Sequence, residues 1–321
     1  MSALAEKPTV FISTCDQCGS SDVIHALSAD PWTLMRCEHC DFVFTSPRLS
    51  DDALARIYAD EYYEQADDYA AQQIEAPSAD HLRLAARARR MLSRRPGSLT
   101  SVDVGCGGGR LVEAFAENGF RASGVEPSEG TVRSAQRAGR AVTNTDVADL
   151  PDACFDCVTA IHVLEHVTAP SAFMADLFRI TRPGGLCIIE VPNFGSRAAR
   201  AQGAAWSALH PGTHLSHFTP GTLAACMQKA GYSVRSLHRL GGAGVFAGVA
   251  DVSSGRKTVA GVAAADRGHQ TRHSILKKAW AARSTIMAIP FVRAFARWVN
   301  WEVLGHGEYV RAFAVRPAQR V

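Results

Sequence analysis

Residues 102–109 are Val-Asp-Val-Gly-Cys-Gly-Gly-Gly, and Gly-Val-Glu-Pro follows at residues 124–127. The valines of the first stretch suit a buried strand. Gly105, Gly107 and Gly109 then remove the side chains that would keep a tight turn away from a ligand. The sequence therefore predicts a strand followed by a turn whose backbone closely approaches a bound molecule.

A helix and a second strand are expected directly after this turn. Residues 111–118 have the pattern of a helix closed by Gly119. Residues 122–125 have the pattern of a strand, and Glu126 follows its end. A carboxylate at this place accepts hydrogen bonds from ribose hydroxyls, so the segment predicts a nucleotide-cofactor site.

Further apolar stretches of strand length continue the alternation of strand and helix. The predicted strands are 141–143, 155–161, 186–191 and 233–240. The predicted helices are 128–138, 170–181 and 221–230, the last opened by Thr219 and Pro220 as N-cap and first residue. This alternation predicts an α/β fold with a doubly wound parallel sheet.

Such sheets bind ligands at the carboxyl ends of their strands. Polar or glycine residues follow the ends of five predicted strands: Gly105, Glu126, Asp146, His162 and Asn193. The sequence therefore predicts that five separate segments meet at one edge of the sheet.

The closely spaced glycines, Asp103-x-Gly105-x-Gly107-x-Gly109, resemble motif I of class I S-adenosylmethionine (SAM) methyltransferases. The resemblance implies a Rossmann-like sheet of seven strands, the last antiparallel and expected near residues 308–316. It also implies that Asp103 and the glycines lie beside the methionine part of SAM and that Glu126 holds the ribose.

The same resemblance places Asp146 and the Val147 amide against the adenine of SAM. A carboxylate that only caps its own loop is the alternative for Asp146. A glycine-rich loop without any cofactor is the alternative for the whole motif.

The first four cysteines occur as two Cys-x-x-Cys pairs, Cys15 with Cys18 and Cys37 with Cys40. This spacing predicts a zinc ribbon with four thiolate ligands, and four protein ligands leave no open coordination position. The expected Zn²⁺ is therefore structural, with a redox role as the alternative. Cys154 and Cys157, although also spaced as a pair, are expected to pack in the core.

After the predicted strand 155–161 comes His162-Val-Leu-Glu165-His166-Val167. This segment resembles quinone O-methyltransferases and zinc-ribbon sugar methyltransferases, in which a Glu-His pair lies at the substrate. The resemblance implies that His166 is a general base and that Glu165 orients it or binds substrate. Because His162 replaces the first acid of a Glu-x-x-Glu-His set, no divalent ion is predicted here. A packed histidine is the alternative for His166.

A second histidine cluster comes after the predicted strand 186–191. His210-Pro-Gly-Thr-His214-Leu-Ser-His217-Phe218 leads into the helix that Thr219 opens. Proline and glycine between His210 and His214 break any helix that would align them as a metal pair. The cluster, together with Trp206 before it, resembles the same small-molecule methyltransferases, in which the insertion after this strand covers the acceptor. The resemblance implies a lid, with His214 touching the acceptor and His217 either there or at the helix entry.

Length, charge and cysteine content limit the partners and the cellular compartment that the sequence predicts. The chain has 321 residues, with 34 basic and 31 acidic side chains and a net charge of +3, so nothing demands a polyanionic partner. No secretory signal or membrane span is predicted, and the odd number of cysteines, nine, indicates a reducing cytoplasm, in a bacterium to judge from the composition. The basic helix around residues 83–90 is expected to be solvated.

These patterns divide the chain into four parts: a zinc ribbon (1–46), a helical cap or linker (47–96), a SAM-binding core (97–250), and a helical extension with the closing strand (251–321). Tyr58, Tyr62, Tyr63 and Tyr69 are expected either near the pocket or in core packing. Residues 274–304 are apolar and basic, which leaves a lid, a dimer contact or a membrane-surface contact open.

Taken together, the sequence predicts methyl transfer from SAM to an oxygen of a small molecule or a carrier-linked sugar. A zinc-ribbon RNA methyltransferase is the first alternative. The expected base-binding Pro-Pro-aromatic motif and a basic, aromatic ribbon are missing from the sequence, so no nucleic-acid partner is predicted. A non-catalytic nucleotide-binding scaffold is the second alternative.

Overall fold

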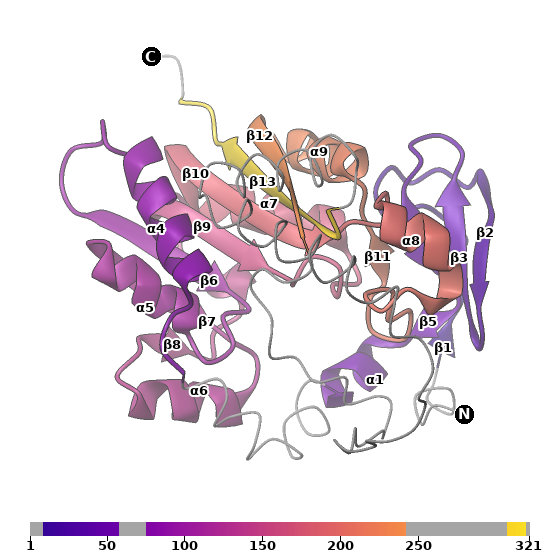
Figure 1. The fold of residues 1–321 in the computed structure, drawn as a ribbon, viewed down its shortest axis with the longest axis horizontal. Helices are drawn as coiled ribbons and strands as arrows, with labels where there is room; N and C mark the ends of the chain where they lie inside the picture. The colour runs from indigo at the N-terminus through magenta and orange to yellow at the C-terminus, as the bar shows by residue number, and fades with distance from the viewer. Residues whose placement is uncertain (1–8, 58–74, 242–306, 319–321) are drawn as a thin grey trace, which may run out of the picture.

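A computed structural model describes residues 9–57, 75–241 and 307–318. Its centre is a seven-stranded sheet, whose strands are in the order β12-β13-β10-β9-β6-β7-β8 (Figure 1). The strands are β6 (Leu99–Val104), β7 (Phe120–Val125), β8 (Val142–Thr143), β9 (Phe155–Ile161), β10 (Thr181–Pro192), β12 (Ser233–Leu240) and β13 (Tyr309–Val315). Only β13 runs antiparallel to its neighbours in this sheet, as predicted for the last strand.

The strand bounds agree closely with the sequence pattern. Strands β9 and β12 have the predicted bounds, 155–161 and 233–240. Strand β10 begins at Thr181, earlier than the predicted residue 186, and its pairing with β9 shifts register between Thr181 and Leu186. The short Arg-Pro-Gly-Gly insertion at 182–185 therefore interrupts the ladder without ending the strand.

Helices cover both faces of the sheet. The helices of the described residues are α1 (Asp51–Arg56), α4 (Ala79–Met91), α5 (Arg110–Glu117), α6 (Glu129–Arg137), α7 (Pro170–Ile180), α8 (Arg197–Gln202) and α9 (Pro220–Lys229), with short 3₁₀ turns η3 (Val147–Asp149) and η4 (Gly203–Ala205). Of these, α1 and α8 pack on the strands of the N-terminal region and not on this sheet. Buried side chains of α4 and α5, such as Leu84 and Phe115, pack on one face, and those of α7 and α9, such as Leu177 and Leu223, on the other. The doubly wound arrangement is therefore confirmed.

Local signals explain where the helices begin. Thr219 caps α9 through a capping box with Thr222, and Pro220 occupies the first turn. Ser128 caps α6 by accepting from the Thr131 amide. The cap at Thr219 was predicted from the sequence, and both caps satisfy otherwise unpaired amides at a helix N-terminus.

The N-terminal region builds a second, four-stranded sheet in the order β11-β4-β3-β2. Its strands are β2 (Val23–Ala29), β3 (Trp32–Cys37), β4 (Val43–Thr45) and β11 (Ser216–His217). A two-stranded sheet pairs β1 (Thr9–Val10) with β5 (Arg48–Leu49). Figure 1 shows β11 beside the strands of the ribbon, although it follows β10 of the main sheet in the sequence.

The ribbon and the main sheet share one hydrophobic core. Phe42 and Phe44, next to the second cysteine pair, are fully buried in the same cluster as Phe218 and Leu223. The ring centroids of Phe42 and Phe218 are 5.2 Å apart. The ribbon is therefore packed against the main domain by apolar side chains, whose burial is the dominant favourable term in folding.

Several sequence expectations lie outside the described residues. These are the tyrosines Tyr58, Tyr62, Tyr63 and Tyr69, the segment 274–304, and most of the predicted extension 251–321. Among the residues that the structure describes, no helix is both long enough and apolar enough to span a bilayer.

Candidate active site

The glycine-rich turn connects β6 to α5 and requires glycine at two positions. Gly105 has φ of 68°, and a Cβ there would lie 2.6 Å from a methyl of Val163. Gly109, with φ of 76°, is the N-cap of α5, and a Cβ there would lie 2.9 Å from a methyl of Val142. Positive φ and close packing together exclude side chains, so the backbone itself forms this part of the site.

Glu126 lies at the end of β7 and is buried against this turn. Its Oε2 accepts from the Gly107 amide at 2.9 Å, and its Oε1 accepts from the Ser128 amide at 3.1 Å. The Asn144 side chain donates to the backbone carbonyls of Glu126 and Pro127, at 2.9 and 2.6 Å. The Glu126 carboxylate and backbone are thus both held in place beside the glycine-rich turn.

Asp103 is buried at the end of β6, next to β9. Its Oδ1 accepts from the Thr159 hydroxyl at 2.6 Å. Burial raises the pKa of Asp103 to about 7; the Thr159 hydrogen bond opposes this rise and the nearby Glu126 charge adds to it. A positively charged ligand at this edge would therefore stabilise the ionised form of Asp103.

Asp146 and Val147 begin the η3 turn after β8. The Asp146 carboxylate accepts from the Ala148 amide at 2.8 Å and so caps η3. Arg179 donates to the Val147 carbonyl at 3.0 Å, which fixes the turn from α7. The structure thus shows the capping role for Asp146, while the predicted adenine contact stays a prediction.

The loop after β9 brings Glu165 and His166 to residues 210–217, the segment for which the sequence predicts a lid and which is called the lid segment below. Glu165, His166 and His214 each direct a carboxylate oxygen or a ring nitrogen to one place, and these atoms lie within 4.8 Å of one another. The Glu165 backbone carbonyl accepts from the amides of Leu215 and Ser216, at 2.7 and 3.1 Å. Two segments far apart in sequence are therefore tied together at the residues predicted to meet the acceptor.

The hydrogen bonds of the two histidines indicate their tautomers. Nδ1 of His166 lies 3.1 Å from the Thr213 carbonyl, and Nδ1 of His214 lies 3.0 Å from the Ala208 carbonyl. Because a carbonyl only accepts, each Nδ1 carries its proton, and the lone pair of the neutral ring is on Nε2. Burial lowers the pKa of His166, and burial together with the neighbouring histidines lowers that of His214 well below 6.5.

His162 has the opposite protonation state from His166 and His214. Its Nδ1 lies 3.1 Å from Oε1 of Glu165 and its Nε2 lies 3.3 Å from Oε1 of Glu190. Burial alone would lower its pKa, but the hydrogen bonds to these two carboxylates raise it to about 9. His162 is therefore a cation at neutral pH and not a base.

A chain of charges continues from His162 across the sheet. Glu190 pairs with Arg311 on β13, and Arg311 also contacts Asp80 on α4 at 2.8 Å. Tyr309 places its ring edge-on to His162, with centroids 5.0 Å apart. Each buried charge thus has an opposite partner, as low-dielectric surroundings require.

Three further polar residues that the sequence analysis named have contacts of their own. Asn193 is buried and bonds the Gly307 carbonyl at 2.9 Å, which is a structural contact. His217 lies in β11 and its Nε2 is 3.1 Å from the Thr45 hydroxyl, so it belongs to the ribbon sheet. Burial lowers the pKa of His217 to about 3. His210 packs edge-on to His214, with centroids 5.1 Å apart, in a turn and not in a helix.

Sequence reasoning missed Glu190, Arg311 and Asn144. Glu190 and Arg311 each interrupt an otherwise apolar strand, Leu-Cys-Ile-Ile-Glu-Val and Tyr-Val-Arg-Ala-Phe-Ala-Val. A single charge within a buried strand is a detectable signal, because such a charge needs a partner. Nothing in the sequence marks which partner it has.

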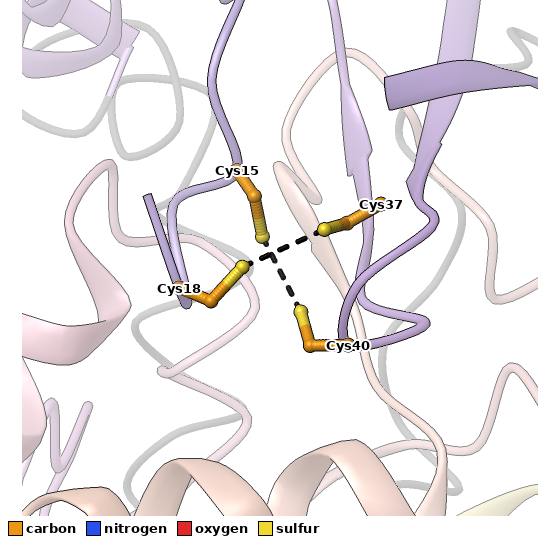
Figure 2. A group of neighbouring side chains, drawn as sticks. All are labelled: Cys15, Cys18, Cys37 and Cys40. Atoms are coloured by element: carbon orange, nitrogen blue, oxygen red, sulfur yellow. Dashed lines mark hydrogen bonds between the residues drawn. The ribbon is translucent and has the colours of Figure 1, made fainter. Parts of the chain in front are cut away.

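The four cysteines of the ribbon converge on one point, as Figure 2 shows. The Sγ atoms of Cys15 and Cys40 are 3.5 Å apart, as are those of Cys18 and Cys37. A tetrahedral Zn²⁺ with bonds of about 2.3 Å would separate its sulfurs by roughly 3.8 Å. The donor set and its spacing therefore fit a tetrathiolate metal ion.

The sheet order, the glycine-rich turn and the acid after β7 define a class I SAM-dependent methyltransferase. A family described as "Methyltransferase domain" matches residues 69–237, and the chain belongs to that family. The predicted enzyme class is thereby confirmed.

Curated relatives match over part of their length. A ubiquinone biosynthesis O-methyltransferase from Maricaulis maris is 31% identical over 153 residues, which are 43% of this chain and 60% of that protein. Its counterpart from Methylococcus capsulatus is 36% identical over 107 residues, 30% of this chain and 45% of that protein. The chain thus spans less than two thirds of these relatives.

One solved structure that resembles the fold is the 1,6-didemethyltoxoflavin-N1-methyltransferase of Burkholderia thailandensis, with its ligand and S-adenosylhomocysteine bound. The two share 19% sequence identity and a TM-score of 0.46, over 67% of this chain and 91% of that one.

Proposed function

We propose that this protein transfers the methyl group of SAM to a hydroxyl oxygen of a small molecule or a carrier-linked sugar, with His166 as general base. The observation that carries the proposal is the neutral His166 imidazole. It is fixed by the Thr213 carbonyl and lies beside Glu165 and His214. The O-methyltransferase relatives support oxygen as the acceptor atom.

SAM supplies an electrophilic sulfonium methyl when it is bound. The acceptor oxygen forms a bond to the methyl carbon as the carbon–sulfur bond breaks, and the hydroxyl proton passes to Nε2 of His166. A base with a pKa at or below the working pH remains unprotonated and ready for this step, and general base catalysis contributes about 10²- to 10⁴-fold in rate.

On the donor side, we assign contacts to Asp103, Gly105, Gly107, Gly109, Glu126, Asp146 and Val147. The exclusion of side chains at Gly105 and the rigid, buried Glu126 carboxylate support this assignment. Asp103 would face the positively charged methionine part of SAM, where its ionised form is favoured by the opposite charge.

On the acceptor side, we assign His166 to the hydroxyl that is methylated, Glu165 and His214 to contacts with other polar groups of the acceptor, and His162 to the support of Glu165. Oε2 of Glu165 is buried and has no hydrogen-bond partner among the described residues. A buried carboxylate oxygen without a partner costs free energy, so an acceptor hydroxyl that donates to it would be bound tightly.

For the ribbon, we assign Cys15, Cys18, Cys37 and Cys40 as ligands of one structural Zn²⁺. We also keep the division into a ribbon (1–46), a linker (47–96), a SAM-binding core (97–250) and an extension (251–321). Strand β11 modifies this division, because the sheet of the ribbon includes two residues of the core.

The experiment is to follow release of S-adenosylhomocysteine from SAM with a panel of phenols, catechols and nucleotide-linked sugars, with ribosomal RNA as a comparison. Turnover with one hydroxyl compound, and a methyl ether found by mass spectrometry, is the expected result. Methylation of RNA alone, or of a carbon or nitrogen atom, would overturn the proposed acceptor. Binding of S-adenosylhomocysteine without any turnover across the panel would favour a scaffold.

A further inference from the structure

Strand β11 joins the lid segment to the ribbon. Ser216 pairs with Phe44 and His217 pairs with Val43, in antiparallel register. Strand β4 itself starts directly after the Cys37–Cys40 knuckle, whose turn is closed by hydrogen bonds from Cys37 to Phe42 and from Asp41 to Cys37. The backbone that carries two metal ligands therefore continues into the strand that holds the lid.

Thr45, at the end of β4, links the ribbon by hydrogen bonds to the segment that carries His214. It is fully buried, and its hydroxyl lies 3.2 Å from the His214 carbonyl and 3.1 Å from Nε2 of His217. The Thr45 amide donates to the Leu215 carbonyl at 3.0 Å. One residue of the ribbon thus fixes the backbone on both sides of residue 215.

The other edge of the same lid segment faces the loop after β9. Leu215 and Ser216 donate their amides to the Glu165 carbonyl, and the Thr213 carbonyl accepts from Nδ1 of His166. Residues 213–217 are therefore bonded to Thr45 on one side and to the Glu165–His166 pair on the other. The donor side is organised differently, because Glu126 bonds to Gly107 and Ser128 of the main sheet.

We propose that Thr45 is a positioning residue for the acceptor side, and that the metal-bound knuckle at Cys37–Cys40 sets the geometry of His166 and His214 through β4 and β11. The inference rests on the proposed function for the roles of these two histidines. It gives the ribbon a task in catalysis beyond its own folding: the metal organises the acceptor half of the site and leaves the donor half independent.

The first test compares Thr45→Val with Thr45→Ser in the full-length, zinc-loaded protein. Valine has nearly the same shape but no hydroxyl, so the tie to His214 is lost, whereas serine restores it. Thr33→Val is the matched control, since Thr33 lies on the adjacent strand β3 of the same sheet. We expect kcat to fall about tenfold in Thr45→Val, because small misplacements of catalytic groups are costly. We expect Thr45→Ser and Thr33→Val to stay within about twofold of wild type.

Two readouts do not depend on an acceptor. In nitrogen-15 spectra of the histidine rings, Thr45→Val should shift the His166 and His214 signals while the titrated affinity for S-adenosylhomocysteine is unchanged. Unshifted signals would overturn the inference, and so would a loss of S-adenosylhomocysteine affinity in Thr45→Val. If no hydroxyl compound is methylated, the proposed function fails while these spectra still decide the positioning role.

The second test removes the metal with a chelator that binds zinc tightly. Hydrogen exchange at the Leu215 and Ser216 amides should become at least about tenfold faster, because their bonds to Glu165 lose support from β4. Binding of S-adenosylhomocysteine should persist. Unchanged exchange at these two amides after complete metal loss would show that the knuckle does not set the acceptor side.

Discussion

The carboxylate of Glu126 accepts a hydrogen bond from the Gly107 amide at 2.9 Å, so the acid after β7 and the glycine-rich turn after β6 form one rigid unit. This unit is prearranged, since both partners are buried or part-buried before any ligand binds. Its removal should therefore affect binding of the donor and not the chemistry of the acceptor.

Replacement of this acid tests the donor site. Glu126→Ala removes the acceptor for the Gly107 and Ser128 amides and for the ribose hydroxyls. Hydrogen bonds to charged groups are worth about 1.5–3 kcal/mol, so the affinity for S-adenosylhomocysteine should fall at least about tenfold in calorimetric titration. Glu117→Ala, an exposed acid on α5, is the control and should bind normally. Equal affinities of Glu126→Ala and wild type would contradict the ribose assignment.

The pKa of Asp103 predicts a pH-dependent stability of the ligand-free protein. Its pKa is about 7 in the fold and 3.8 in the unfolded chain, so between these values the fold binds one more proton than the unfolded chain does. Stability must therefore decrease as pH rises from about 4 to 7 and then level off. Urea unfolding of wild type and Asp103→Asn should show that wild type loses this contribution over that range. A constant difference between the two proteins would rule out the raised pKa.

His166 should affect turnover only. His166→Ala is expected to lower kcat by about 10²- to 10⁴-fold and leave S-adenosylhomocysteine affinity near normal, with His25→Ala on the ribbon surface as the control. Because burial lowers the pKa of His166 below 6.5, activity should fall only in the acid range below that pH. Chelation that leaves the ribbon metal bound should not change the rate. Loss of activity under that treatment would replace the general base by a metal ion at Glu165, His166 and His214.

The two carboxylates that bond His162 predict a second pH effect on stability, at higher pH. A pKa of about 9 in the fold against 6.5 unfolded means that the stabilisation is complete below pH 6.5 and is lost as pH rises through 9. The facing groups are Glu165, Glu190 and Tyr309. His162→Gln should be less stable than wild type by about 3 kcal/mol at pH 6, because it leaves a buried carboxylate with less compensation. The stability gap should shrink toward pH 10 in denaturant titrations, and a gap independent of pH would mean that His162 is neutral.

The ribbon should hold one metal ion. Cys37→Ser is expected to reduce bound zinc, measured by elemental analysis, and to lower the unfolding temperature, since structural zinc supplies folding free energy. Cys154→Ser is the matched control, because Cys154 lies in the main domain and is only partly buried. Full zinc content in Cys37→Ser would refute the tetrathiolate site.

The sequence predicted what local patterns control. Strand 155–161, strand 233–240 and the Thr219–Pro220 helix start follow from apolar periodicity and capping chemistry, which act within a few residues. The placing of Glu165, His166 and His214 at one acceptor site came from a family resemblance, and the structure brings these three side chains together.

What the sequence did not predict depends on contacts between distant segments. Strand β11 has two residues and exists only because β4 lies beside it, so no periodicity marks it. The sequence therefore does not decide whether His217 contacts the acceptor or the helix entry, whereas in the fold its ring bonds Thr45. The Glu190–Arg311 pair joins residues 121 positions apart, and only the fold brings them together.

Strand β13 lies inside the sheet, between β10 and β12, although it is the last strand in the sequence. Until Tyr309–Val315 has left the ribosome, both of these neighbours expose unpaired edges that can pair with other chains. Glu190 meanwhile lacks the arginine that neutralises it. The buried charges of His162 and Glu190 can therefore reach their final arrangement only after this last strand has been made, however early the glycine-rich turn has formed.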